Sequence, residues 1–399
     1  MRIPVHIATA FGLEGLVADE LRELALEPFT VSNGRIDLVT DWTGLARLHV
    51  HLRMAERIWI PLASFKAKDF DTLFDGTRAI PWENWLSRDA RMHVEGKSLR
   101  SKLSSVPACQ AIVKKALIEA MRRSHRLERF PENGARHRIL VSLVDDTATI
   151  SLDATGDGLH KRGYRPLTGP APLRETLAAA MVTLSRWEPD RILLDPCCGS
   201  GTLLVEAAWM AQNRAPGLSR SFDAEAWPMG DRQAWDQVRQ AARAAIRHDV
   251  EFRGMYGQDR DGAILVQARE HLRLAGLEGV VHVQRLPFEE WRTKRLYGVI
   301  LANPPYGERI GDEAEIESLY RRFGQVLVEN PSWSAFILTS NPRLEEWMGR
   351  RSDRKRKLFN ANLRTDLHQF FGPLPPSRRD SAPDDEFDHL PARIPQEET

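Results

Sequence analysis

The chain has 399 residues, 42% of them hydrophobic, and this length is enough for two or three domains with buried cores. No apolar run reaches the length of about 18 residues that a membrane span needs, and the first residues lack the apolar block of a signal peptide. Three cysteines, two of them adjacent, do not make a disulfide framework, and no Cys/His spacing indicates zinc. We therefore expect a cytoplasmic protein that uses no membrane and no metal.

The net charge of +1 conceals an uneven distribution of charged side chains. Residues 97–138 contain 11 Lys and Arg against 3 Asp and Glu, whereas residues 372–399 contain 3 against 7. A local positive excess attracts a phosphate backbone. The Pro-rich acidic segment has too few apolar residues to offset the entropy of ordering. The sequence thus predicts a nucleic-acid-binding region in the first half of the chain and a disordered tail at 372–399.

Two α+β units are expected before residue 166. Residues 1–40 predict a strand at 4–9, a helix at 13–26 with leucines on one face, and a strand at 35–39. Residues 41–165 form the second unit, whose expected elements are a helix at 43–54, strands at 57–62 and 91–96, a basic helix at 106–125, and a hairpin of strands at 138–143 and 147–152.

The second unit carries the candidate contacts to RNA. These basic residues are Lys97, Arg100, Lys102, Lys114, Lys115, Arg122 and Arg123, with Arg162 in the glycine-rich connector at 156–165. The order of elements resembles a THUMP RNA-binding domain preceded by a small ferredoxin-like unit, and the resemblance implies RNA as the partner. A solvated basic helix face is the alternative that the pattern leaves open.

A glycine turn organises the second half of the chain. Asp195-Pro196-Cys197-Cys198-Gly199-Ser200-Gly201-Thr202 lies between a strand-like apolar run and a helical pattern. Glycines let the backbone approach a ligand, and free N–H groups at the helix start favour a polar or anionic group. The turn lacks the spacing of dinucleotide and P-loop motifs. It resembles motif I of the class I S-adenosylmethionine-dependent methyltransferases, although an ordinary tight turn has the same pattern.

A second motif, Asn303-Pro304-Pro305-Tyr306, follows the strand-like run 297–300. It resembles motif IV of methyltransferases that modify exocyclic amino groups. The resemblance implies catalytic roles for Asn303, Pro304 and Tyr306. The Asn303 Oδ1 and the Pro304 carbonyl would accept hydrogen bonds from the amino group, and the Tyr306 ring would stack on a base taken out of its helix.

Residues 166–371 are expected to form an α/β domain, a doubly wound, Rossmann-like methyltransferase domain. Its parallel strands are expected at 191–195, 252–257, 280–284, 297–302 and 334–340, followed by a closing hairpin at 357–360 and 363–371. A long helical insertion at 203–251 has no assigned role.

The cofactor contacts that the methyltransferase motifs imply are Asp195, Cys197, Gly199, Ser200, Gly201, Thr202, Asp259 and Asn303. Asp259 is expected to accept hydrogen bonds from the ribose hydroxyls, as an acidic residue at that strand end does in nucleotide sites. Asp261 suits the N-cap of the next helix. Pro287 stands where related enzymes often have an acidic residue that reaches the adenine, so the adenine contact stays unassigned.

Four stretches together narrow the resemblance to one family. They read GDGLHKRGYR…APLRETLAAA, LLDPCCGSGTLLVEAA, RAPGL and LANPPYGERI. Together they resemble the bacterial 23S rRNA guanine-N2 methyltransferase family (RlmL-like), from the N-terminus to about Phe371. This implies an S-adenosylmethionine-dependent rRNA (guanine-N2)-methyltransferase. Two alternatives remain open: a tRNA guanine-N2 methyltransferase, and a catalytically inert RNA-binding factor of ribosome assembly.

Overall fold

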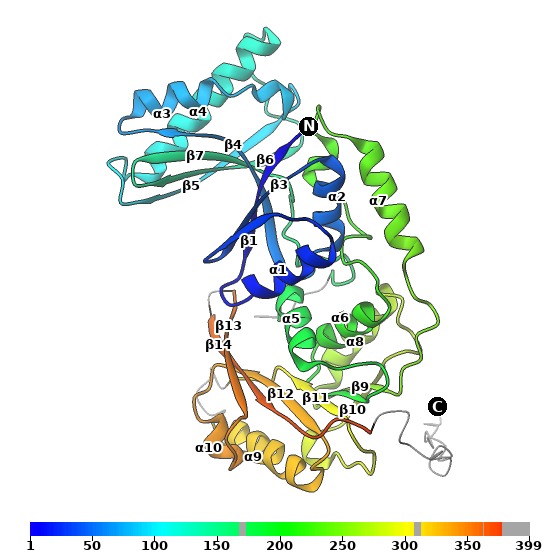
Figure 1. Cartoon of the computed structure of the whole chain (residues 1–399). Helices are drawn as coiled ribbons and strands as arrows, with labels where there is room; N and C mark the ends of the chain where they lie inside the picture. Colours follow the sequence, from blue (N-terminus) through cyan, green and yellow to red (C-terminus); the bar gives the residue numbers. More distant parts are fainter. Residues whose placement is uncertain (167–172, 307–312, 362, 377–399) are drawn as a thin grey trace.

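The computed structural model describes residues 1–166, 173–306, 313–361 and 363–376. Within these ranges the strands form two sheets of seven strands each, here called the N-terminal and the C-terminal sheet. Figure 1 shows them at opposite ends of an elongated molecule, with helices of both parts between them. In the described parts of the chain, no helix is both long and apolar enough to cross a membrane, and no group of three His, Cys, Asp or Glu could hold a metal ion.

The N-terminal sheet has the strand order β2-β3-β1-β4-β7-β6-β5. Its strands are β1 (Ile3–Thr9), β2 (Phe29–Ser32), β3 (Arg35–Thr40), β4 (Ala55–Lys66), β5 (Arg91–Leu99), β6 (Arg136–Val144) and β7 (Thr147–Asp153). The first part of β4 pairs with β1 and its remainder pairs with β7, so one sheet runs through both predicted units. The order of strands and helices in the ferredoxin-like unit continues into β4, so this unit extends beyond residue 40.

Four helices accompany this sheet: α1 (Glu14–Glu23), α2 (Trp42–His51), α3 (Phe70–Arg78) and α4 (Val106–His125). The predicted basic helix is confirmed as α4, which buries Cys109, Val113 and Leu117. The sequence did not reveal β2 and α3. Helix α3 is short and contains Gly76, which interrupts its helical pattern; a Cβ there would lie 2.4 Å from the Phe65 ring.

The C-terminal sheet has the strand order β10-β9-β8-β11-β12-β14-β13. Its strands are β8 (Leu193–Asp195), β9 (Met255–Asp259), β10 (His282–Arg285), β11 (Val299–Ala302), β12 (Ser334–Thr339), β13 (Arg354–Asn360) and β14 (Leu363–Phe370). The strands from β10 to β12 are parallel, and β13 and β14 form the predicted antiparallel hairpin. The chain order reverses between β8 and β11, and ligands bind at such a switch point in open α/β sheets.

Helices cover both faces of this sheet. They are α5 (Glu175–Ser185), α6 (Thr202–Ala211), α8 (Gly262–Leu274) and α9 (Glu313–Glu329), with α10 (Leu344–Met348) and the short 3-10 helix η3 (Phe288–Glu290) packed on α9. Helix α7 (Arg232–Ala244) and the 3-10 helix η2 (Asp223–Ala226) lie outside this sheet, and the 3-10 helix η1 (Trp82–Asn84) contacts α4 in the N-terminal half. Leu193 belongs to the core shared with the N-terminal sheet, whereas the adjacent Leu194 belongs to a second core that includes Ile300 and Phe323. Successive strand residues point to opposite faces, so β8 is buried on both sides.

The insertion at 203–251 joins the two halves of the molecule. Its helix α7 packs against α2 of the ferredoxin-like unit, as Figure 1 shows. The His49 ring lies 4.8 Å from the ring of Phe222 and 5.2 Å from that of Trp235. Burial lowers the pKa of His49 to about 3, so this imidazole is neutral inside an aromatic cluster. The insertion is therefore an interdomain contact built from apolar packing.

The buried side chain of Arg162 corrects one prediction. Its Nε lies 3.4 Å from Glu206 Oε1 in α6, and its other nitrogens donate to the carbonyls of Leu159 and Arg53. The exposed fraction of the Arg162 side chain is 1%, and that of the Glu206 side chain is 0%. A guanidinium held in this way faces the interdomain core, so Arg162 does not contact RNA as the sequence predicted.

Residues 372–376, the first part of the predicted disordered tail, belong to the described residues. The Gly372 N–H donates to Ser334 Oγ at 3.1 Å, so this glycine still packs on the C-terminal sheet. A Cβ at Gly372 would lie 2.6 Å from the Trp333 carbonyl oxygen. The remaining tail from 377 lies outside the described residues.

Candidate functional site

The candidate cofactor site lies where β8, β9 and β11 end. Asp195 and Asp259 are the last residues of β8 and β9, and Asn303 directly follows β11, so all three stand at the same edge of the sheet. The loop after β10 carries Pro287, followed by the exposed Glu289 in η3. The topology thus brings together three residues that are spread over more than a hundred positions of the chain.

The glycine loop has an open side. Gly199 and Gly201 have φ values of +50° and +81°, in the left-handed region that side chains disfavour. A Cβ on Gly199 would meet no described atom within 4 Å, whereas one on Gly201 would lie 3.7 Å from Ala268. Gly201 donates its N–H to the Cys198 carbonyl at 2.8 Å, which closes the turn before α6 begins at Thr202. The loop therefore presents backbone atoms to a ligand at Gly199.

Asp259 connects the two loops. Its Oδ2 accepts a hydrogen bond from the Gly199 N–H at 3.0 Å, and its Oδ1 accepts one from the Asp261 N–H at 3.0 Å. A carboxylate has about four acceptor positions, so both oxygens keep capacity for ligand hydroxyls. Asp261 is the N-cap of α8, as expected, because its Oδ1 accepts from the Ala263 N–H at 2.8 Å. Only Asp259 of these two carboxylates faces the glycine loop through a hydrogen bond.

Asp195 is a buried acidic residue in the electrostatic neighbourhood of Asp259. Its Oδ1 accepts a hydrogen bond from the Cys197 N–H at 3.2 Å. Burial raises the pKa of Asp195 well above its ordinary value, and the nearby charge of Asp259 raises it further. A cationic ligand beside these two groups would favour their charged forms. Burial likewise raises the pKa of the Cys197 and Cys198 thiols, so neither is a thiolate at neutral pH.

The buried ion pair of Arg165 and Glu175 contacts the end of the glycine loop, and the sequence did not predict it. Arg165 Nη1 lies 3.1 Å from Glu175 Oε1 and donates to Thr202 Oγ1 at 3.1 Å. Ser200 Oγ lies 3.3 Å from Thr202 Oγ1, so both loop hydroxyls belong to this network. His271 Nδ1 lies 3.1 Å from the Ser200 carbonyl oxygen. The only signal in the sequence was the run of charged residues around the connector, because the pairing depends on the fold.

The Asn-Pro-Pro-Tyr loop folds back on itself. The Tyr306 hydroxyl donates a hydrogen bond to Asn303 Oδ1, and Pro304 between them is buried. An amide oxygen has two lone pairs, so Asn303 Oδ1 can accept one further hydrogen bond. The loop therefore holds an acceptor and an aromatic ring in fixed relation at the end of β11. The chain from 307 to 312 lies outside the described residues.

The predicted RNA-binding residues other than Arg162 are spread along α4 and the end of β5. A helix of 20 residues is about 30 Å long, so the two ends of α4 are far apart. Arg100 pairs with Asp145 at 2.8 Å and Lys114 pairs with Glu132 at 2.9 Å. The Lys115 ammonium lies 5.7 Å from the centre of the Phe74 ring. Lys97, Lys102, Arg122 and Arg123 are exposed.

This geometry defines the class of the protein. A doubly wound sheet with a glycine loop after β8, an acidic residue after β9 and an Asn-Pro-Pro-Tyr loop after β11 is a Rossmann-like methyltransferase domain, whose cofactor is S-adenosylmethionine. The open Gly199 and the carboxylates of Asp195 and Asp259 fit a ligand that carries positive charge and ribose hydroxyls.

Three family models match the chain. They are the RlmL ferredoxin-like domain at residues 5–59, the THUMP domain at 67–153 and the RMKL-like methyltransferase domain at 162–369. The chain belongs to the RMKL-like family of RNA methyltransferases. The family resemblance and the fold class that the sequence predicted are thereby confirmed.

Relatives match nearly the whole chain. "Putative RNA methyltransferase YpsC" of Bacillus subtilis (strain 168) is 41% identical over 376 residues, which cover 94% of this chain and 97% of that protein. Ribosomal RNA large subunit methyltransferase K/L of Syntrophotalea carbinolica is 34% identical over 90% of this chain and 52% of that protein. The chain thus spans about half the length of this K/L relative.

Two solved structures have a similar fold over most of their length. SMU.472, described as a putative methyltransferase complexed with SAH, has a TM-score of 0.86 and 38% identity, with 94% of this chain and 99% of that one covered. A protein of Listeria monocytogenes, described as a predicted N6-adenine-specific DNA methylase, has a TM-score of 0.87 and 41% identity, with 94% and 97% covered.

Proposed function

We propose that this RNA methyltransferase transfers a methyl group to the exocyclic N2 of a guanine in 23S rRNA. The observation that carries this proposal is the Asn303-Pro304-Pro305-Tyr306 loop, which follows β11 next to the switch point of the sheet. The loop offers an amide oxygen and an aromatic ring, which suit an amino group on a planar base. The match of a THUMP domain and the name of the K/L relative support RNA, and large-subunit rRNA in particular.

S-adenosylmethionine, when bound, supplies an electrophilic methyl group on a sulfonium centre. We assign its binding to Asp195, Asp259 and the backbone of the glycine loop. Asp259 would accept hydrogen bonds from the ribose hydroxyls, since its oxygens retain acceptor capacity. Ser200 and Thr202 would act by holding the loop, because their hydroxyls lie in the Arg165 network. The side chain of Cys197 is given no further role than its N–H contact to Asp195.

Guanine N2 is a weak nucleophile because its lone pair is shared with the ring. The Asn303 Oδ1 and the Pro304 carbonyl would accept the N2–H hydrogens and concentrate electron density on nitrogen. Tyr306 would stack on the base and, through its hydroxyl, keep Asn303 in position. Alignment of the reacting atoms then supplies much of the acceleration, and no strong base is needed if the proton leaves after transfer.

Two other functions remain as alternatives. A tRNA guanine-N2 methyltransferase would use the same loop on another RNA. An inert assembly factor would keep the fold without methyl transfer, but Asp195, Gly199, Gly201, Asn303 and Tyr306 are all present. Methylation of DNA adenine, which the name of the Listeria protein suggests, fits the matched THUMP domain less well.

Mass spectrometry of RNA from a deletion strain tests the proposal. Loss of one N2-methylguanine from 23S rRNA, restored by the wild-type gene but not by an Asn303→Ala gene, is the expected result. Loss of the same modification from tRNA would replace rRNA by tRNA as the substrate. Calorimetry with S-adenosylmethionine distinguishes an active methyltransferase from an inert assembly factor, because the inert factor would not bind the cofactor.

A further inference from the structure

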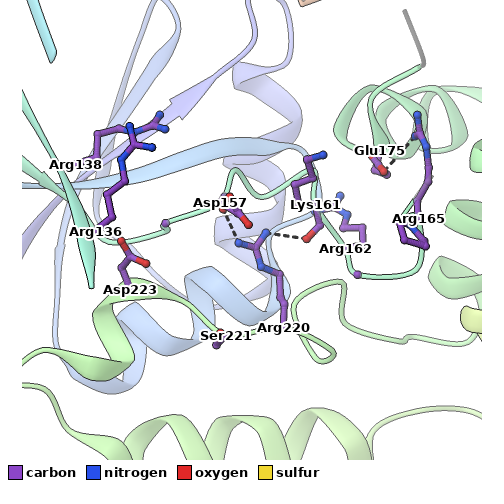
Figure 2. A pocket seen from close by; sticks show the side chains of 13 residues that line it. Arg136, Arg138, Asp157, Lys161, Arg162, Arg165, Glu175, Arg220, Ser221 and Asp223 are labelled. Atoms are coloured by element: carbon purple, nitrogen blue, oxygen red, sulfur yellow. Dashed lines mark hydrogen bonds and ion pairs between the residues drawn. The ribbon is translucent and has the colours of Figure 1, made fainter. Parts of the chain in front are cut away.

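A cavity of about 550 Å³ lies between the THUMP part and the methyltransferase part of the chain. Figure 2 shows its walls, formed by β6, the connector and the segment before η2. Its lining includes Arg136, Arg138, Lys161, Arg165, Arg220 and Asp223. This volume is in the range of about 300–1,000 Å³ that is usual for ligand sites.

The cavity has an excess of positive charge. Six of its lining residues are Lys or Arg and three are Asp or Glu. Arg138 lies 3.3 Å from Glu95, and Arg165 pairs with Glu175. By contrast, Arg136 and Lys161 form no ion pair within 4.0 Å in the described part of the chain, and both are exposed. Two cations at the cavity are therefore available to a ligand.

Hydrogen bonds from Arg220 fix the part of the connector that lines the cavity. Arg220 donates hydrogen bonds to the carbonyls of Asp157, Gly158 and Lys161, so it fixes the connector loop (Figure 2). Burial lowers the pKa of Arg220 to about 10, so its guanidinium is still charged at neutral pH. This arrangement fixes the loop that carries Lys161 to the segment before η2.

The two ends of the cavity belong to different functional parts. Arg136 and Arg138 stand on β6, next to the edge strand β5 of the THUMP part. At the other end, Arg165 donates to Thr202 Oγ1 at the start of α6, one residue beyond the glycine loop. Figure 2 shows these arginines on opposite sides of the cavity. A strand lying here would pass from the THUMP sheet to the cofactor loop.

We propose that this cavity binds phosphate groups of the substrate RNA, with Arg136 and Lys161 as the direct contacts and Arg138 beside them. A concave site with an excess of positive charge attracts anions, and each nucleotide brings one phosphate. The basic side chains of α4 then attract RNA in general, while the cavity determines where the RNA strand enters the active site. The proposal rests on the proposed function, because it needs RNA as the substrate.

The test compares two double variants by titration of an unmodified 23S rRNA transcript at several salt concentrations. Arg136→Ala with Lys161→Ala removes the proposed contacts. Arg232→Ala with Arg243→Ala removes two exposed arginines of α7 outside the cavity and is the matched control. We expect the cavity variant to bind about tenfold more weakly or worse at physiological salt, and the slope of log K against log salt to fall by about 1.4, since each single-strand contact contributes about 0.7.

The charge-preserving variant Arg136→Lys with Lys161→Arg should recover most of the affinity. Affinity for S-adenosylmethionine should stay at the wild-type value in all variants. Equal affinity and slope in the cavity variant and the α7 control would overturn the proposal. If the wild-type protein does not methylate 23S rRNA but its RNA binding still depends on Arg136 and Lys161, the proposed function is wrong and the cavity assignment stands.

Discussion

The C-terminal sheet gathers polar side chains at one edge, whereas the N-terminal sheet distributes them over several surfaces. Parallel strands all end at the same edge, so Asp195, Asp259 and Asn303 meet although they are far apart in sequence. The N-terminal sheet is antiparallel except between β5 and β6, within the described strands. Its basic residues therefore lie at both ends of the sheet and along α4. The parallel sheet thus collects its functional side chains in one site, whereas the antiparallel sheet spreads its basic side chains over an extended surface.

We expect the largest effect on stability from loss of the Arg162–Glu206 ion pair, which joins the two halves of the molecule. Arg162→Ala leaves the buried Glu206 carboxylate without its charge partner, and we expect the protein to lose about 3–5 kcal/mol of stability. Urea unfolding followed by circular dichroism measures this loss. Lys161→Ala, an exposed neighbour, is the control and should change stability by about 0.5 kcal/mol or less. A loss below about 1 kcal/mol for Arg162→Ala would mean that the connection is not held by this pair.

In the C-terminal sheet, Asn303→Ala should lower the rate of methyl transfer about 10²–10³-fold, as does loss of an acceptor or donor tuned to a reacting group. Cofactor affinity should stay near the wild-type value. Asn303→Asp keeps the acceptor and should retain more activity than the alanine variant. Single-turnover methylation of unmethylated rRNA with saturating cofactor measures both. Turnover by Asn303→Ala at the wild-type rate would exclude the Asn-Pro-Pro-Tyr loop from catalysis.

Asp259→Ala should weaken S-adenosylmethionine binding by about 1.5–3 kcal/mol, through loss of charge-assisted hydrogen bonds. Asp261→Ala is the matched control from the same turn. It removes the N-cap of α8 and should cost about 1 kcal/mol of stability, with cofactor affinity nearly unchanged. Calorimetry measures affinity and thermal melting measures stability. Equal cofactor affinity in Asp259→Ala and wild type would remove Asp259 from the site.

On the N-terminal side, neutralising Lys114, Lys115, Arg122 and Arg123 together should reduce the salt dependence of RNA binding. The decrease in slope should be smaller than about 2.8, the value for four single-strand contacts, because Lys114 already pairs with Glu132. Fluorescence anisotropy with labelled rRNA fragments measures the slope. No change in slope would make α4 a solvated basic face.

The smallest effect is expected at the C-terminus. Truncation after residue 376 should leave melting temperature and methylation as in the wild type. Truncation after Phe371 also removes the hydrogen bond from Gly372 to Ser334, and should cost about 0.5–1.5 kcal/mol. A failure of the longer truncated protein to fold would show that the acidic segment contributes to the fold.

Short patterns predicted much of the C-terminal half. Strands β8 and β11 are buried apolar runs that end at Asp195 and just before Asn303, so these strands and residues could be found together. Strand β9, which ends at Asp259, and strand β10 are less apolar, and the sequence predicted both to begin a few residues too early. The same approach missed β2 and α3, which lack such a run. It also placed Arg162 on an RNA surface, because a basic residue in a glycine-rich stretch looks exposed until its partner, 44 positions away, is known.

The sequence by itself determined the glycine loop, the Asn-Pro-Pro-Tyr loop, α4 and the order of domains, because each depends on neighbours in the chain. Tertiary structure alone decided that Arg162 is buried on Glu206, that Arg165 supports Thr202, and that α7 lies on α2. It also decided that Arg136 and Lys161 share one cavity. These are contacts between residues distant in the sequence, and local propensity or periodicity carries no information about which side chain a charge will meet after folding.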